Sequence, residues 1–301
     1  MNHAIQGVHC AAATPITADR RPDLPVFADH CRALLDEGCH GIALLGTTGE
    51  ANSFSMADRK SLVEAAIESG IPADTLLPGT STPVISDTVE LSRHAVDAGA
   101  RGVVLLPPYY YKGVSDEGLF RFYADVIEGV GDNRLRVVLY HIPQVTQVPI
   151  THALIDRLLN AFPGIVCGIK DSSGELENMK AMCERFPRLG VLSGADPLML
   201  PLLRMGGAGC ITSTSNLRAD ALRAVWNGWR NPDRAAEVET AQDRINSWRT
   251  LSNTYVQLPT IKAMLAHAKG HPGWLRPMPP LVELDETECR DVWDRMDRLD
   301  A

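Results

Sequence analysis

The sequence predicts an α/β fold, a (β/α)8 TIM barrel with a C-terminal helical extension. Short apolar runs alternate with longer amphipathic segments, which is the pattern of parallel strands joined by helices. Eight such runs recur at near-regular intervals, and the GxGxxG turn of a doubly wound nucleotide-binding sheet is missing. The 301 residues exceed the roughly 250 of a typical barrel, which leaves room for added helices. A doubly wound sheet is the alternative that this pattern disfavours.

Each predicted strand is too short to be a helix and is rich in β-branched residues or Leu without polar alternation, as in strands buried on both faces. In chain order the runs are Val8–Thr14, Gly41–Leu45, Leu76–Gly79, Gly102–Leu106, Arg136–Tyr140, Ile165–Lys170, Gly190–Leu192 and Gly209–Ile211. Between the second and third runs, helical spacing places Leu62, Ala65, Ala66 and Ser69 on one face, and Gly70 marks the end of that helix.

Beyond Leu217 the sequence is helical throughout, with Pro232 and Pro272 as breaks. We therefore expect the barrel over residues 1–230 and, over residues 231–301, a helical extension that packs on the barrel within a single functional unit. The extension is expected to include helices at Thr260–Lys269 and Glu286–Leu299.

Composition and charge exclude several classes of partner. With 45% hydrophobic and 22% charged residues the chain is globular, and its formal net charge of −8 disfavours nucleic acid and anionic membranes as partners. The seven cysteines form no CxxC pair, so neither a zinc site nor a disulfide framework is expected. The N-terminus lacks a basic stretch followed by a long apolar segment. A cytoplasmic location and a small-molecule partner are the expectation.

In a closed barrel the catalytic groups project from the C-terminal ends of the strands. Lys170 ends an apolar strand, where partial desolvation favours the neutral amine that attacks a carbonyl carbon to form a Schiff base. The alternative is a lysine that extends its charged end to the barrel rim. Tyr140 ends the preceding strand, where its phenol can transfer a proton during imine chemistry, and simple packing is the alternative.

The loop Gly46–Gly49, with sequence GTTG, follows the second predicted strand. Its backbone N–H groups and two hydroxyls suit a small carboxylate, and a tight turn without a ligand is the alternative. A phosphate loop is disfavoured, because no Lys-Ser or Lys-Thr follows the second glycine.

Two further sequence features can be explained without a catalytic role. Tyr109–Tyr111 follow two prolines and predict a stiff aromatic loop that serves as a subunit contact or as a lid. His267 and His271 have i, i+4 spacing but lack the internal Glu of a zinc-protease helix, so we expect them at the surface.

Taken together, these strings resemble the dihydrodipicolinate synthase and N-acetylneuraminate lyase superfamily, the class I pyruvate-dependent aldolases, in order along nearly the whole chain. The resemblance implies the same barrel with C-terminal helices, a homotetramer built as a dimer of dimers, and no metal or organic cofactor. It is carried by Gly46-Thr47-Thr48-Gly49-Glu50, by Tyr140-His141-Ile142-Pro143, by Gly168-Ile169-Lys170-Asp171 and by Ser193-Gly194-Ala195-Asp196.

The resemblance implies that Lys170 forms an imine with pyruvate or a related 2-oxo acid and that Tyr140 is the central acid and base. Tyr110 resembles a tyrosine that completes the proton relay across a dimer interface, and Ile211 a residue whose backbone carbonyl lies near the lysine. The expected catalytic residues are Lys170, Tyr140, Thr48 and Tyr110, and the expected substrate-binding residues are Thr47, Thr48, Gly49, Val145, Ser172, Asp196, Ile211 and Ser213.

Departures from the family pattern bear on the second substrate. The synthases have an arginine that binds the carboxylate of aspartate semialdehyde, and Val145 occupies that position here. Sialate lyases grip a polyhydroxylated substrate with an Asp-Glu pair, of which only Asp196 is present. His141 replaces the usual asparagine, with an effect that the sequence does not reveal. Met56 and Arg59 replace the histidines of the lysine feedback site, so no inhibition by lysine is expected.

Four functions follow from these residues. The leading hypothesis is a lyase or aldolase that joins pyruvate to an aldehyde without a distal carboxylate, or cleaves a 4-hydroxy-2-oxo acid. Ser172, Asp196 and Ser213 would bind hydroxyls of that substrate. The alternatives are a 2-oxo-3-deoxy sugar acid dehydratase that uses the same imine, 4-hydroxy-tetrahydrodipicolinate synthase proper, and a non-catalytic 2-oxo acid sensor.

Overall fold

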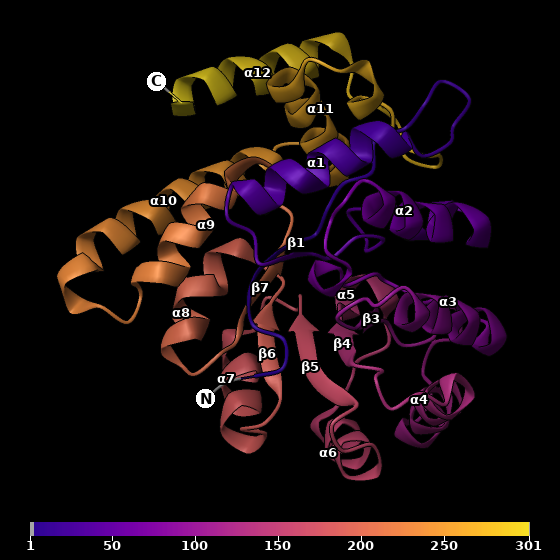
Figure 1. The fold of residues 1–301 in the computed structure, drawn as a ribbon. Helices are drawn as coiled ribbons and strands as arrows, with labels where there is room; N and C mark the ends of the chain where they lie inside the picture. Colours follow the sequence, from indigo (N-terminus) through magenta and orange to yellow (C-terminus); the bar gives the residue numbers. More distant parts are fainter. Residues whose placement is uncertain (1–2, 301) are drawn as a thin grey trace. The chain divides into compact units, whose positions relative to one another are not determined.

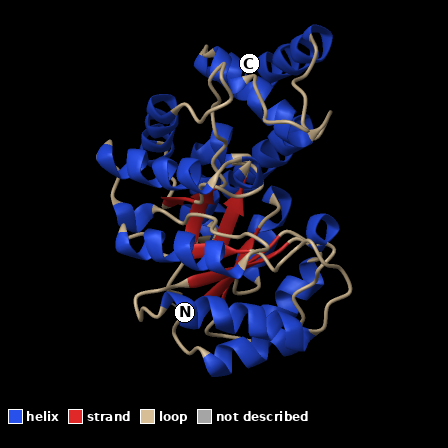
Figure 2. Ribbon diagram, turned by 90° about the vertical axis from the view of Figure 1, so that its right-hand side faces the viewer, coloured by secondary structure: helices blue, strands red, loops and turns tan. Residues whose placement is uncertain are grey.

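The computed structural model of the chain describes residues 3–300, which divide into two compact units. The first unit consists of the N-terminal chain through Gly7 and of Pro72–Ile211. The second consists of Val8–Ile71 and of the chain from Thr212 onward. In Figure 2 the strands, in red, are flanked by helices, in blue. Among the described residues no helix is long and apolar enough to cross a membrane.

The first unit contains parallel strands whose residues are buried. Figure 1 shows β4, β5 and β6 as arrows that point the same way. The neighbours pair in the order β3, β4, β5, β6, β7, and each pair is parallel. The strands are β3 (Val103–Leu105), β4 (Val137–His141), β5 (Val166–Asp171), β6 (Gly190–Ser193) and β7 (Gly209–Thr212), the last residue of which begins the second unit.

Helices connect these strands, as parallel pairing requires. Ser115 and Thr151 cap two of them by accepting the N–H groups of Gly118 and Leu154. Phe122 and Tyr123 of α4 are buried in the same apolar core as the strand residues. The helices of the first unit are α3 (Ile85–Asp97), α4 (Asp116–Val130), α5 (Pro143–Thr146), α6 (His152–Ala161), α7 (Leu176–Arg185) and α8 (Met199–Arg204).

The second unit contains the short parallel pair of β1 (Gly7–Cys10), which starts in the first unit, and β2 (Gly41–Ile42). Ser55 caps α2 by accepting the N–H of Asp58. Figure 1 shows α11 and α12, in yellow tones, side by side. The helices of this unit are α1 (Leu24–Asp36), α2 (Met56–Glu68), α9 (Ser215–Gly228), α10 (Ala235–Ser252), α11 (Gln257–Lys269) and α12 (Glu286–Asp300).

The C-terminal helices follow the predicted breaks and share a core with earlier parts of their unit. Pro232 and Pro272 each begin a 3₁₀ turn. Trp248 of α10, Met264 of α11 and Val292 of α12 pack together, with Leu217 of α9 against them. Short 3₁₀ turns occur at η1 (Ala51–Ser53), η2 (Ala73–Thr75), η3 (Asp196–Leu198), η4 (Pro232–Arg234) and η5 (Pro272–Trp274).

The predicted strand Leu76–Gly79 is wrong: the described residues contain seven strands, and this segment makes only an isolated bridge from Gly79 to Val104. It nevertheless runs beside β3, because the N–H of Val104 donates to the Pro78 carbonyl and the N–H of Thr80 to the Val104 carbonyl, at 3.0 and 3.3 Å. Pro78 has no N–H to donate, so a regular ladder cannot form.

The first predicted strand is also shorter than expected, since β1 ends at Cys10 rather than Thr14. Beyond Cys10 the pairing is irregular: the N–H of Ala11 donates to the Thr212 carbonyl at 2.8 Å and that of Ala12 to the Ala43 carbonyl at 3.3 Å. A side chain supplies further partners. Asn216 Nδ2 donates to the Ala11 carbonyl at 2.9 Å, and Asn216 Oδ1 accepts the Ala13 N–H at 3.0 Å. The backbone beyond β1 is therefore satisfied by single bonds to neighbouring segments and by Asn216, without a continuous ladder.

Candidate functional site

Two chemically reactive side chains meet at the C-terminal ends of β4 and β5. Tyr140 and Lys170 are partners in the register of these strands, which places them side by side. The Lys170 Nζ lies over the Tyr140 ring, 4.1 Å from its centroid, in a cation–π arrangement. The two residues are only 3% and 5% exposed. The strands thus hold an amine against a phenol ring with little water around them.

The next register pair, His141 and Asp171, has a different environment. Asp171 accepts the Ser173 N–H at 2.7 Å and the Asn178 amide at 2.8 Å, so both of its carboxylate oxygens are bonded. His141 Nδ1 accepts the Ile150 N–H at 3.1 Å, which leaves the proton of the neutral ring on Nε2. Burial lowers the pKa of His141, and the Asp171 carboxylate opposes that shift. The structure therefore gives His141 a local role, anchoring the chain just before α6.

A cavity of about 530 Å³ lies beside this second pair. It is lined by His141, the last residue of β4, and by residues that follow β4 and β5, among them His152, Ser173, Glu175 and Asn178. Tyr140 and Lys170 are absent from its lining. The cavity and the amine–phenol pair are thus separate features of the strand ends.

Ser172 follows the lysine strand and is fixed by its neighbours. Its N–H donates to the His141 carbonyl at 2.8 Å, and its carbonyl accepts from the Gln144 amide at 2.6 Å. A Cβ atom on Gly194 would overlap the Ser172 hydroxyl and lie 3.0 Å from the Asp171 carbonyl. Glycine at 194 is therefore required for this packing.

The other predicted site residues of the first unit differ in their solvent exposure. Asp196 and Ile211 are fully buried, at the start of η3 and in β7. Tyr110 is 72% exposed and meets Tyr111 edge to face, with ring centroids 5.2 Å apart. Val145, in α5, is 59% exposed. The structure thus brings Tyr140, Lys170 and Ser172 together but leaves Tyr110 and Val145 at the surface of the described chain.

Lys112 is a basic residue near Val145 that sequence reasoning missed. Its Nζ donates to the carbonyls of Tyr109 and Thr146, the latter at 2.8 Å, and Thr146 follows Val145 in α5. A cation therefore lies against α5, the helix that contains Val145. The signal available in the sequence was its place directly after the Tyr109–Tyr111 loop.

In the second unit, the loop Gly46–Gly49 forms a tight turn. The N–H groups of Glu50 and Ala51 donate to the carbonyls of Thr47 and Gly46 at 3.1 and 3.3 Å. Thr47 is exposed, Thr48 half-buried and Gly49 buried. The loop lies between two non-glycine residues in the left-handed region, Leu45 with φ 59° and Glu50 with φ 56°. Such backbone is unfavourable for side-chain-bearing residues, so surrounding contacts must hold it.

Glu50 supplies one of those contacts through an ion pair with Lys262 of α11. Lys262 Nζ and Glu50 Oε1 are 2.5 Å apart, with the two side chains 0% and 2% exposed. Burial lowers the pKa of Lys262, and the Glu50 carboxylate opposes that shift. Sequence reasoning missed Lys262, although a single lysine within the otherwise uncharged run Pro259–Ala266 was the available signal.

Ser213, which directly follows β7, is buried and receives a hydrogen bond from Arg249 Nη1 at 3.1 Å. Its hydroxyl was predicted to bind substrate, and in this structure it contacts a guanidinium of α10. Ser213 also accepts, at its carbonyl, the Asn216 amide at 2.8 Å. The end of β7 is therefore well fixed within its unit.

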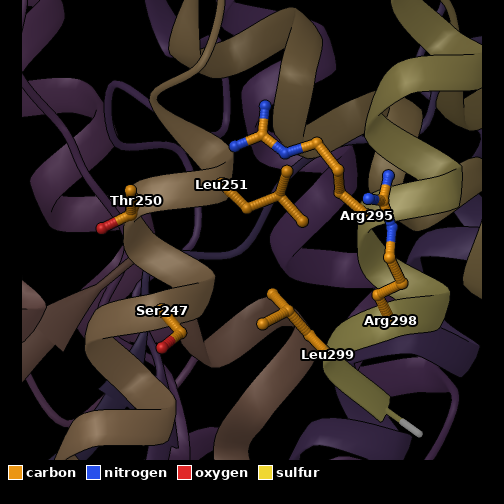
Figure 3. Close-up of a pocket in the computed structure, with 6 residues that line it drawn as sticks. All are labelled: Ser247, Thr250, Leu251, Arg295, Arg298 and Leu299. Carbon is orange, nitrogen blue, oxygen red and sulfur yellow. The ribbon is translucent and has the colours of Figure 1, made fainter.

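A further cavity, of about 370 Å³, lies between α10 and α12. Figure 3 shows Arg295 and Arg298 on one side of it and Ser247, Thr250 and Leu251 on the other. Arg295 is paired with Asp291 at 3.3 Å, which offsets part of its charge. None of the predicted site residues lines this cavity.

The chain is similar over nearly its whole length to proteins of one family. A model of the dihydrodipicolinate synthetase family matches residues 4–296. An uncharacterised DapA-like lyase of Chloroflexus aurantiacus is 34% identical over 294 residues, which cover 97% of each chain. YagE of Escherichia coli, described as a putative 2-dehydro-3-deoxy-D-gluconate aldolase, is 30% identical over 93% of this chain and 92% of its own.

Solved structures agree with these matches. Dihydrodipicolinate synthase from Agrobacterium tumefaciens superposes with a TM-score of 0.89 at 31% identity, over 98% of this chain and 99% of that one. YagE in complex with pyruvate also gives a TM-score of 0.89, at 28% identity and with the same coverage. The fold is accordingly α/β and barrel-like.

Proposed function

We propose that this chain, which belongs to the dihydrodipicolinate synthetase family, is a lyase that joins pyruvate to an aldehyde or cleaves a 4-hydroxy-2-oxo acid through an imine on Lys170. One observation carries the proposal: a buried lysine amine lies 4.1 Å from the centroid of the Tyr140 ring at the ends of two parallel strands. Strand ends of this kind carry the active sites of barrel enzymes. The pyruvate complex of YagE supports pyruvate as the donor.

The chemistry requires only this chain's side chains. The Lys170 amine adds to the C2 carbonyl of the 2-oxo acid, and the resulting carbinolamine loses water to give an iminium ion. The iminium draws electrons from C3, so a C3 proton leaves and the enamine carbon attacks the aldehyde, whose oxygen takes up a proton. Water then releases the product and restores the amine. Tyr140 is the proposed acid and base for these proton transfers.

Other predicted residues complete the proposal. Thr47, Thr48 and Gly49 would hold the carboxylate of the 2-oxo acid through hydroxyl and N–H groups, without a full positive charge. Tyr110, with its exposed phenol, would extend the proton relay from a second copy of the chain in a homotetramer. The proposed lining for the second substrate comprises Val145, Ser172, Asp196, Ile211 and Ser213.

The test is mass spectrometry of the intact protein after borohydride reduction in the presence of pyruvate. A reduced pyruvyl adduct that maps to Lys170 and is lost in Lys170→Ala is the expected result. Lys180→Ala, a partly exposed lysine of α7, is the matched control and should retain the adduct. No adduct on the wild-type protein would remove pyruvate as donor. An adduct that persists in Lys170→Ala would overturn the assignment of the lysine.

A second candidate, 4-hydroxy-tetrahydrodipicolinate synthase proper, is favoured by Lys112. Its ammonium lies 2.8 Å from the Thr146 carbonyl, next to Val145, and can supply the charge that an aldehyde carboxylate needs. Turnover with aspartate semialdehyde and its loss in Lys112→Met would support this candidate. Equal turnover of carboxylated and neutral aldehydes in both proteins would exclude it. Product analysis with a 2-oxo-3-deoxy sugar acid separates cleavage from dehydration.

A further inference from the structure

We infer that the buried Glu50–Lys262 ion pair is a positioning device that fixes the Gly46–Gly49 loop in the shape that binds the substrate carboxylate. The inference rests on the proposed function, because that function assigns the carboxylate to this loop. All of the residues that carry it belong to the second unit. Neither Glu50 nor Lys262 is proposed to touch substrate.

The loop needs outside support because its backbone is unfavourable at both ends. Leu45 and Glu50 have φ values of 59° and 56°, in the region that favours glycine. Gly49 cannot accept a side chain, since a Cβ there would lie 2.9 Å from the Ala12 carbonyl oxygen and from the Leu45 nitrogen. Strained turns of this kind persist only when surrounding contacts define them.

Glu50 makes contacts to two segments that are remote in sequence. Its Oε1 pairs with Lys262 at 2.5 Å, and its Oε2 accepts the Met278 N–H at 2.6 Å. Thr14 adds a bond from its hydroxyl to the Gly49 carbonyl, at 2.9 Å. The last residue of the GTTGE string is therefore tied at both carboxylate oxygens to α11 and to the chain after η5.

The charge of the pair matters as well as its shape. Removing both charges of an ion pair from water costs a large desolvation free energy, and this pair has almost no solvent exposure. The pair is therefore poorly explained as a source of stability. It is better explained by the single geometry that it enforces on Glu50 and Lys262. The carboxylate loop contains no basic residue, and its affinity must come from well-aimed N–H and hydroxyl groups. Such a site is sensitive to small displacements of the backbone.

The experiment measures the pyruvate concentration that gives half-maximal borohydride trapping in the full chain. Glu50→Gln disrupts the charge pair with nearly the same volume, and Glu50→Gln/Lys262→Met replaces it with a neutral pair in case the single variant does not fold. Asp58→Asn is the matched control, because it breaks a 2.7 Å ion pair with Arg21 in the same unit but has no contact with the loop in the described structure. Hydrogen exchange of the Glu50 and Ala51 amides reports loop order independently.

Both pair variants should require about tenfold more pyruvate or higher for half-maximal trapping. Their trapping rate at saturating pyruvate should stay near that of the wild type, since Lys170 and Tyr140 are intact. The Glu50 and Ala51 amides should exchange faster, and Asp58→Asn should match the wild type in both readouts. The inference would be overturned if both pair variants reached half-maximal trapping at the wild-type pyruvate concentration. It would also be overturned if Asp58→Asn raised that concentration as much as the pair variants do.

The proposed function and the positioning role of the ion pair predict different failures in this experiment. If the wild-type protein forms no pyruvyl adduct, the proposed function fails. If the wild type is trapped and the pair variants need no more pyruvate, only the positioning role fails.

Discussion

Lys170 Nζ lies over the face of the Tyr140 ring, 4.1 Å from its centroid, and the two residues are direct partners in the β4–β5 register. The contact follows from parallel pairing, because Tyr140 and Lys170 each come one residue before the end of their strand. The amine thus faces an aromatic ring and is surrounded by little water. The pair is thus the natural place to test the proposed chemistry.

Tyr140→Phe should keep the aromatic face and lose the phenol. Because the ring contact with Lys170 is preserved, we expect unfolding by urea to be little changed. Loss of the proposed acid and base should slow imine trapping by about 100-fold or more. Single-turnover trapping rates at saturating pyruvate are the measurement. A wild-type rate in Tyr140→Phe would show that the phenol transfers no proton in imine formation.

Gly194→Ala should destabilise the protein and impair trapping. The new Cβ would overlap the Ser172 hydroxyl and press on the Asp171 carbonyl, next to Lys170. Overpacking of this kind typically costs about 1–3 kcal/mol, which thermal unfolding can resolve. Gly118→Ala is the matched control, because its Cβ would meet only the Ser115 hydroxyl at 3.7 Å. Equal melting temperatures for the two variants would contradict the packing argument.

Protonation of His30 should lower the free energy of unfolding in mild acid. Its side chain is buried against Trp274 and Asn216, and burial lowers its pKa from 6.5 to about 4. Between these values the unfolded chain holds a proton that the folded chain does not, so stability present above pH 6.5 is lost as the pH falls toward 4. The loss is about 3 kcal/mol. Urea unfolding at several pH values measures it.

The control for that prediction is His30→Gln, which can still donate to Asn216 Oδ1 but does not titrate. The variant will lose a constant amount of stability from the altered packing. Its decline between pH 6.5 and 4 should be shallower than that of the wild type, since other histidines with lowered pKa, such as His141, contribute equally to both. Parallel pH profiles would exclude His30 as the source.

Lysine should not inhibit the enzyme. The family resemblance assigns Met56 and Arg59 to the positions at which the feedback site of the synthases has histidines, and Arg59 is buried in α2. We expect no heat of lysine binding in calorimetry and no change in turnover at millimolar lysine. Tight binding in calorimetry would contradict this prediction, and Met56→His/Arg59→His would then show whether these positions are involved.

The sequence by itself determined the order of the elements and the identity of the reactive pair. Apolar runs that lead into Tyr140 and Lys170 are local features, and the rules of parallel α/β folds bring such strand ends to the same edge of a sheet. The breaks at Pro232 and Pro272 are equally local. The strand prediction failed at Leu76–Gly79, because Pro78 removes a hydrogen-bond donor from an otherwise strand-like run. The hydrophobic pattern alone does not reveal that loss.

The tertiary structure alone decided which polar groups meet across long distances in the chain. Glu50 pairs with Lys262, Asn216 satisfies the backbone beyond β1, and Arg249 bonds to Ser213, each through contacts between segments far apart or in different helices. Buried polar groups must find partners, but composition and spacing do not say which partner is nearest after folding. The sequence could therefore name the amine and the phenol of the proposed site, whereas only the folded chain shows that Glu50 ties the Gly46–Gly49 loop to Lys262 and Met278.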